Sequence, residues 1–264
     1  MALAVGCLGG AGQALAEGQR AIVISEPMEQ LVMERTGNRG VLMDVASGNP
    51  SRGVTVAVHG IRGAPDAMQP ILDEAASKGG LVQAFVYDDN HQRLDDVSHD
   101  LAGELARVLT SERKGPLEIK AHSMGARVVL GALRELNDQG LLDHKVHVTL
   151  LAPTLEGYRA ADFAVLCPTV LCKSIPGVIP GKDMGRGSDY QQRLEELTLP
   201  DTVKTTIYQG EKDPIVEWSA PGFVKIAKNL KADVVYVRDG NHVDVLDSVA
   251  AHQMHLFSPI PSLR

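Results

Sequence analysis

The sequence predicts a single α/β domain built on a doubly wound, mostly parallel sheet of about eight strands with helices on both faces. Two observations predict this fold class. Apolar runs of strand length alternate with amphipathic helical patterns along most of the 264 residues. Most of these runs are continuously apolar or β-branched, as expected for strands that are buried on both faces. Strand and helix in strict alternation favour right-handed crossovers, which produce such a sheet.

The elements follow one another in a regular order. We expect an opening pair of strands at 20–25 and 41–45, separated by the turn "TGNRG". Further strands are predicted at 54–58, 81–87, 117–121, 146–151, 205–209 and 233–237. Amphipathic patterns predict helices over 66–78, 93–112, 125–138, 221–230 and 243–255.

One interval, 156–200, breaks this order. It is rich in Gly and Pro and contains one short helical pattern at 189–198. An insertion of this length between strands predicts a small lid or binding loop. Cys167 and Cys172 lie within it in "CPTVLC". Their spacing leaves open a disulfide, which an oxidising compartment would favour, or two reduced thiols.

The first 16 residues predict a signal peptide. They carry no charge and end in Ala14-Leu15-Ala16, a small-x-small pattern typical of a cleavage site. A basic segment at the start is missing, and lipid attachment at Cys7 or a disordered apolar tail are the competing interpretations. We therefore expect an exported domain over 17–264, periplasmic or secreted and without a stable membrane span. If the leader is not genuine, the protein is cytoplasmic.

Charge and composition disfavour several classes of partner. The chain has 26 Lys and Arg against 33 Asp and Glu, a net charge of -7, and only 4% aromatic residues. Acidic surfaces repel the phosphate backbone and few rings are present for base stacking, so no nucleic-acid partner is expected. The acidic stretch "YDDNHQRLDD" around His91 matches no compact ligand set and is interpreted as a solvated loop. The sequence indicates neither a metal nor a cofactor.

Polar residues follow the predicted strands at the points where these strands end. "HGIRG" (59–63) follows 54–58, and Ser123 follows 117–121 after one intervening histidine. Asp213 comes after 205–209, and His242 comes after 233–237. Because the carboxyl ends of parallel strands share one edge of a sheet, we expect a serine, an aspartate and a histidine to meet there.

Ser123 occupies an abrupt strand-to-helix corner. A turn this tight strains the backbone of the serine and requires small residues two positions to either side. Ala121 and Gly125 are such residues. The N-terminus of the following helix would direct free N–H groups toward the hydroxyl. The alternative, an ordinary helix N-cap, would not explain the histidine and acid loops.

Four motifs together resemble the α/β-hydrolase fold family over most of residues 20 to 256. "AHSMG" is similar to the nucleophile elbow, with Ala121 where the family usually has glycine. "VAVHGIRG" is similar to the oxyanion loop, "YQGEKDPIV" to the acid loop and "DGNHVDVL" to the histidine loop. The motifs occur in the family's order, and the first two look most like those of lipases and related acyl hydrolases.

The resemblance implies roles for particular residues. Ser123 would be the nucleophile and His242 the general base, with Asp213 orienting the imidazole. Glu156 and Asp244 remain rival acids. The oxyanion hole would be formed by the backbone N–H groups of Met124 and Ile61, with Arg62 as an alternative to Ile61. His59, Gly60 and Arg62 would shape the oxyanion loop.

These roles predict a serine hydrolase that cleaves a small-molecule or lipid-like carboxylic ester through an acyl-enzyme. It would be esterase-like or lipase-like and would need no cofactor. The same residues would also serve a thioesterase or an acyltransferase, because the fold and the triad define acyl transfer but not the acyl donor. A non-catalytic binding protein on this scaffold is a further alternative. The sequence does not define an oligomeric state.

Overall fold

A seven-stranded sheet forms the centre of the protein in the computed structural model, which describes residues 20–111, 115–157 and 178–251. The strand order is β1-β3-β2-β4-β5-β6-β7. The strands are β1 (Val41–Ala46), β2 (Val54–Val58), β3 (Leu81–Val86), β4 (Leu117–His122), β5 (Val146–Leu151), β6 (Val203–Gly210) and β7 (Asp233–Val237). β1 pairs with β3 in the antiparallel direction, and every other neighbouring pair is parallel.

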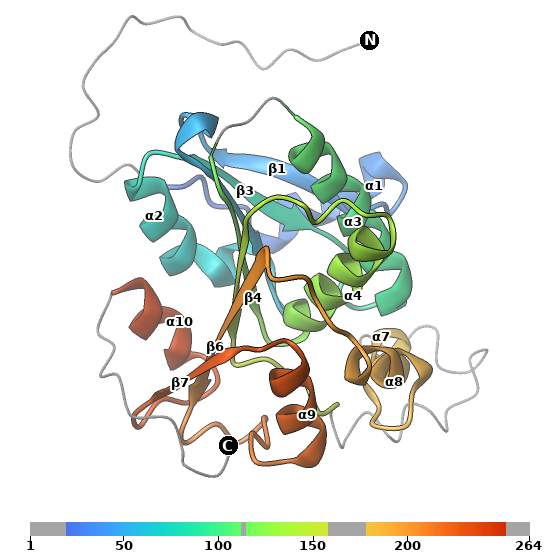
Figure 1. Ribbon diagram of the computed structural model, residues 1–264. Helices are drawn as coiled ribbons and strands as arrows, with labels where there is room; N and C mark the ends of the chain where they lie inside the picture. Colours follow the sequence, from blue (N-terminus) through green and yellow to red (C-terminus); the bar gives the residue numbers. More distant parts are fainter. Residues whose placement is uncertain (1–19, 112–114, 158–177, 252–264) are drawn as a thin grey trace, which may run out of the picture.

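Helices cover both faces of this sheet, so the predicted doubly wound α/β class is confirmed. Figure 1 shows α2 and α10 on one side, with α3, α4 and α9 on the other. The helices of the described residues are α1 (Glu26–Thr36), α2 (Gln69–Ser77), α3 (Leu94–Thr110), α4 (Met124–Asp138), α7 (Val178–Met184), α8 (Asp189–Glu195), α9 (Pro221–Asn229) and α10 (Asp244–Ala250), with short 3-10 turns η1 (Pro50–Arg52) and η2 (Pro65–Met68).

Two apolar cores hold the layers together. One core joins the sheet to α3, α4, α8 and α9, and the other joins it to α2, α10 and the segment that precedes β1. All five residues of β2 are buried, as its run of apolar and β-branched residues predicts for a central strand. This packing fixes the carboxyl ends of β2, β4, β6 and β7 relative to one another, and the predicted site residues follow these ends.

The opening of the chain differs from the predicted pair of strands. Residues 20–25 form no strand. Their backbone hydrogen bond to β1 runs from the Ile22 N–H to the Val45 carbonyl at 2.7 Å, and the Ile24 carbonyl accepts instead from the Asp66 N–H at 3.1 Å. Residues 26–36 form α1 instead. Pro27 stands in its first turn, where no intrahelical N–H is needed, and Gly37 ends it in the left-handed region at φ 67°. The described sheet therefore has seven strands rather than about eight.

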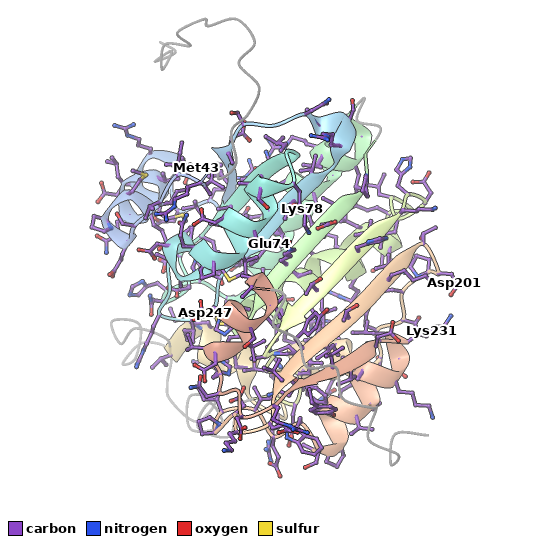
Figure 2. All side chains as sticks on the ribbon, turned by 90° about the vertical axis from the view of Figure 1, so that its left-hand side faces the viewer. Met43, Glu74, Lys78, Asp201, Lys231 and Asp247 are labelled. Atoms are coloured by element: carbon purple, nitrogen blue, oxygen red, sulfur yellow. The ribbon has the colours of Figure 1, made fainter. Side chains whose placement is uncertain are left out.

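Ion pairs tie the helices and loops to the sheet. Glu74 on α2 accepts from Lys78 at 2.8 Å and from Lys120 of β4 at 2.6 Å. Lys231 and Asp201 form another pair at 2.7 Å, between the loops that enter β7 and β6. Figure 2 labels Glu74, Lys78, Lys231 and Asp201. The Lys231–Asp201 pair lies at the amino edge of the sheet, opposite the edge where the predicted site residues lie.

The described part of the predicted lid docks on α3 and α4. Asp183 at the end of α7 accepts from the side chain of Arg93 and from the Leu94 N–H. Arg127 of α4 is fully buried and donates to the Asp183 carbonyl at 2.8 Å and to Gln191 of α8 at 2.6 Å. These contacts hold α7 and α8 against the body of the domain.

Two predictions fall outside the described residues. Cys167 and Cys172 lie in 158–177 and the predicted leader lies in 1–19, so both remain predictions. Of the helices in the described ranges, none is long and apolar enough to cross a membrane.

Candidate active site

Ser123 lies at the corner between β4 and α4. Its backbone has φ 53° and ψ -121°, a conformation that non-glycine residues rarely adopt and that costs about 1–3 kcal/mol. Its N–H donates to the Leu151 carbonyl at 3.0 Å, which anchors the corner to β5. At Gly125 a Cβ atom would lie 2.2 Å from the His59 carbonyl oxygen. A small residue there lets α4 pack directly on the end of β2, as the elbow pattern predicts.

His242 connects the serine to an aspartate. Its Nε2 lies 2.8 Å from Ser123 Oγ, and its Nδ1 lies 2.8 Å from Asp213 Oδ2. The imidazole and the hydroxyl are both buried. Because a carboxylate can only accept, Nδ1 carries the proton and Nε2 presents its lone pair to the hydroxyl. Three loops distant in sequence thus bring together the alcohol, the imidazole and the carboxylate that the sequence analysis selected.

The carboxylate of Asp213 is held by four donors. Its Oδ1 accepts from the backbone N–H of Ile215 at 2.8 Å and of Val216 at 3.1 Å. Its Oδ2 accepts from His242 and from Gln209 Nε2 at 3.1 Å. Burial alone would raise the pKa of Asp213, but His242 and the two backbone donors outweigh it and hold this pKa below its ordinary value. The aspartate is therefore ionised and fixed in orientation.

The two rival acids have other partners. Glu156 forms an ion pair with Arg186 at 2.7 Å. Asp244 accepts from the backbone N–H of Asn241 at 3.2 Å. Asp213 is the carboxylate that the structure places against His242.

His122 immediately precedes the serine but its ring contacts a different group. Its Nε2 lies 3.0 Å from the backbone carbonyl of His242. Burial lowers the pKa of His122 to about 4, so this ring is neutral at pH 7 and its N–H donates to that carbonyl. The contact supports the backbone of the loop that carries His242.

The loop that follows β2 lies against the serine. At Gly60 a Cβ atom would lie 2.8 Å from Ser123 Cβ, so the absence of a side chain permits this approach. Ile61 comes next and is half-buried, and Arg62 is exposed with φ 56°. On the other side of the serine, Met124 begins α4, and the first N–H groups of a helix have no intrahelical partner.

The sequence analysis missed several residues that hold this loop. Tyr87 donates its hydroxyl to the His59 carbonyl at 2.6 Å, and Asp89 accepts from the Gly63 N–H at 3.0 Å. Glu29 of α1 lies 2.9 Å from His59 Nε2. Asp89 belongs to the acidic stretch that was expected to be solvated, yet it is 5% exposed. Its place in the loop that follows β3, three residues after the strand ends and at the same edge of the sheet, is the signal that could have identified it.

The strand order, with one antiparallel strand at an edge and the serine corner after a central strand, defines an α/β-hydrolase fold. No family model and no curated protein matches this chain in sequence. Solved structures do match. The mature lipase BlEst2 of Bacillus licheniformis superimposes with a TM-score of 0.58 at 14% identity, over 82% of this chain and 96% of that one.

Two other structures illustrate the range of similar proteins. A soluble variant of the monoglyceride lipase of Saccharomyces cerevisiae gives a TM-score of 0.57 at 12% identity, over 81% of this chain and 89% of that one. YbtT, a type II thioesterase of the yersiniabactin biosynthetic pathway, gives 0.54 at 15% identity, over 81% and 95%. At these identities the likeness concerns the fold alone. The proteins that share this fold include lipases and a thioesterase.

Proposed function

We propose that the protein is a serine hydrolase that cleaves a carboxylic ester through an acyl-enzyme on Ser123. The observation that carries this proposal is the continuous chain of contacts from Ser123 Oγ through His242 to Asp213, with 2.8 Å at each step. A serine hydroxyl is a weak nucleophile near neutral pH and requires a base within hydrogen-bond reach. His242 Nε2 meets this requirement.

The reaction would proceed in two halves. As Ser123 Oγ attacks the ester carbonyl, its proton moves to His242 Nε2, and the carbonyl π electrons move onto oxygen. The intermediate collapses when the C–O bond to the alcohol breaks and the imidazolium donates the proton to the departing oxygen. Water then attacks the acyl-enzyme with His242 as base again, which releases the acid and restores Ser123.

The surroundings of the serine suit this sequence of steps. We assign the oxyanion hole to the backbone N–H groups of Met124 and Ile61, which flank Ser123 from α4 and from the loop after β2. Such a donor typically lowers the barrier by about 3–4 kcal/mol. Asp213 would stabilise the imidazolium that forms when His242 accepts the proton.

A thioester is the second candidate substrate, because a type II thioesterase is among the proteins of similar fold. The two reactions share every step up to the departure of the leaving group. A thiolate departs without protonation more readily than an alkoxide, because a thiol is the stronger acid. Thioester cleavage would therefore depend less on the proton that His242 returns.

A substrate panel tests the proposal. Purified protein is assayed with p-nitrophenyl esters of increasing acyl length, beside a thioester and an amide. A fluorophosphonate probe is applied in parallel to the wild type and to Ser123→Ala, His242→Ala and His144→Ala. His144 has a side chain 59% exposed and serves as the matched control. We expect labelling and turnover in the wild type and the control only. Absence of both in the wild type would favour a binding protein.

A further inference from the structure

The loop after β2 is braced by a buried histidine. The His59 ring is 1% exposed and stacks on Tyr87, with ring centroids 4.4 Å apart and planes inclined by 24°. Its Nδ1 lies 2.9 Å from the Gly60 carbonyl oxygen. The same Gly60 lies against Ser123, and Ile61 follows it directly. The orientation of this imidazole therefore sets the orientation of the peptide that leads into Ile61.

The two nitrogens of His59 both face oxygen atoms. Nδ1 faces the Gly60 carbonyl, which can only accept, so Nδ1 carries a proton. Nε2 lies 2.9 Å from Glu29 Oε1, a distance at which a protonated ring and a carboxylate form an ion pair. A bare lone pair on Nε2 would repel the carboxylate, and a second proton on the ring removes that repulsion. Burial opposes the charge, but Glu29, Asp89 and the Gly60 carbonyl together raise the pKa of His59.

Glu29 comes from an element that contributes nothing else to the proposed chemistry. It lies on α1 and is 6% exposed, on the wall of a surface pocket of about 930 Å³. A carboxylate is rarely buried to this extent unless it is paired, and His59 is its partner. The other titratable or charged groups that line this pocket are Glu26, Glu34, Arg62, Asp66, Tyr87, Asp88, Asp89 and His91.

We propose that Glu29 is a positioning residue for the oxyanion loop, acting through its buried ion pair with His59. The inference rests on the proposed function, because it concerns the donor that Ile61 would present to the oxyanion. With Glu29 in place, the imidazole is held by charge at Nε2, by Tyr87 on its face and by the Gly60 carbonyl at Nδ1. Without Glu29, the ring loses the contact that fixes its far edge, and the peptide between Gly60 and Ile61 loses its brace.

Three substitutions at one position separate this role from a general loss of stability. Glu29→Leu removes the partner of Nε2. Glu29→Asp keeps the charge but withdraws it by one methylene. Glu29→Gln rescues the contact in a different way, because its amide N–H can donate to the bare Nε2 of a neutral His59 and leave the Nδ1 contact intact. Glu34→Leu is the matched control, since Glu34 lies on the same helix and borders the same pocket, with its side chain exposed.

The readout is the response of the oxyanion site, measured on whichever p-nitrophenyl ester the wild type cleaves best. We expect Glu29→Leu to lower kcat by about 10- to 100-fold with KM changed by less than about threefold, because a misplaced donor weakens the transition state more than the ground state. Glu29→Asp should lie between Glu29→Leu and the wild type. Glu29→Gln should stay within about threefold of the wild type.

An arylboronic acid supplies the second readout. Ser123 Oγ adds to boron as its proton passes to His242, and the tetrahedral boronate then carries the negative charge beside the oxyanion donors. Its Ki should rise in each variant by the factor by which kcat/KM falls, as expected for an analogue of the transition state. A smaller folded fraction would instead lower the rate and the fluorophosphonate-labelled fraction together and leave Ki unchanged.

The outcomes are separable from those of the proposed function. A wild type that neither cleaves any ester or thioester nor takes the probe contradicts the proposed function. A wild type that does both, with wild-type kcat and boronate Ki in Glu29→Leu, overturns the positioning role. If Glu29→Leu does not fold, Glu29→Asp decides in the same way, and an unchanged Ki in that variant overturns the role.

Discussion

The contact between Asp213 and His242 gives the sharpest prediction. In Asp213→Asn, the amide oxygen can keep the hydrogen bonds from the Ile215 and Val216 N–H groups. The amide nitrogen then occupies the place of Oδ2, beside His242 Nδ1. A flip of the Gln209 side chain would turn its Oε1, which has no hydrogen-bond partner, toward the new N–H group, at the cost of the 3.3 Å hydrogen bond from Nε2 to the Gly210 carbonyl. The fold should therefore accept the substitution.

Catalysis, in contrast, should be strongly impaired by Asp213→Asn. An amide N–H facing Nδ1 requires a lone pair there, so the proton of the imidazole moves to Nε2. Nε2 then can no longer accept the proton of Ser123. We expect kcat to fall by about 10⁴-fold, the loss typical of a triad imidazole held in the wrong tautomer. At 1.36 kcal/mol for each factor of ten, this corresponds to about 5.4 kcal/mol of barrier.

The assay is p-nitrophenyl ester hydrolysis by the wild type, by Asp213→Asn and by Glu156→Gln. Glu156 pairs with Arg186, so Glu156→Gln should keep kcat within about twofold, since a partly exposed ion pair contributes little. Circular dichroism confirms that all three proteins are folded. Activity of Asp213→Asn within about tenfold of the wild type would refute the tautomer argument. Loss of activity in Glu156→Gln instead would transfer the role to Glu156.

Three further substitutions, the first with a matched control, test other parts of the structure. Gly60→Ala would place a carbon 2.8 Å from Ser123 Cβ and should lower kcat by about 100-fold, whereas Gly187→Ala, with no atom within 4 Å of the new carbon, should leave kcat unchanged. Burial raises the pKa of Asp89 from 3.8 to about 6, so the folded state loses stability as pH rises through that interval. Asp89→Asn should then stabilise the protein by up to about 3 kcal/mol at pH 7.5 and by nothing below pH ~4, measured by urea unfolding at both pH values. Arg127→Met removes three hydrogen bonds and leaves the buried Gln191 Oε1 without its donor, whereas the Asp183 and Thr154 carbonyls keep the Ser188 hydroxyl and the Gly157 N–H. The substitution should cost about 3 kcal/mol in the same assay, and a cost below about 1 kcal/mol would contradict that account.

The sheet was predictable because its strands are short runs of mainly apolar and β-branched residues separated by helical patterns, and the central strand β2 is buried along its whole length. α1 was not, because its exposed and buried positions contradict the usual pattern. Met28 is 41% and Leu31 46% exposed, while Glu29 is buried. The run at 20–25 was wrongly predicted to be a strand. Its apolar pattern suggested a buried element, but Ile22 is 62% exposed. In both segments, the pattern of hydrophobic residues therefore does not indicate which positions are buried.

The same contrast applies to the site. Ser123, Asp213 and His242 could be selected from sequence because each lies in a loop directly after a parallel strand, and parallel strands end at one edge. Glu29 could not, because it reaches the site from a helix that was not predicted, through a pair 30 positions apart in the chain. Sequence patterns thus identify groups that are placed by the sheet. Groups that are placed by the packing of a helix can be identified only from the structure.

Three histidines at this edge of the sheet differ in what surrounds them, and this difference separates their parts in the proposed reaction. His59 faces oxygen atoms at both nitrogens, which favours a ring that holds two protons and has no lone pair to offer. His122 is kept neutral by burial, with its pKa lowered to about 4. Its ring centre lies 4.9 Å from that of His242. A positive charge there would oppose the imidazolium of His242 by about 3 kcal/mol at an effective dielectric constant of about 20. Of the three histidines, only His242 donates an N–H to a carboxylate while its other nitrogen presents a lone pair to a hydroxyl. It gains its proton beside the neutral ring of His122.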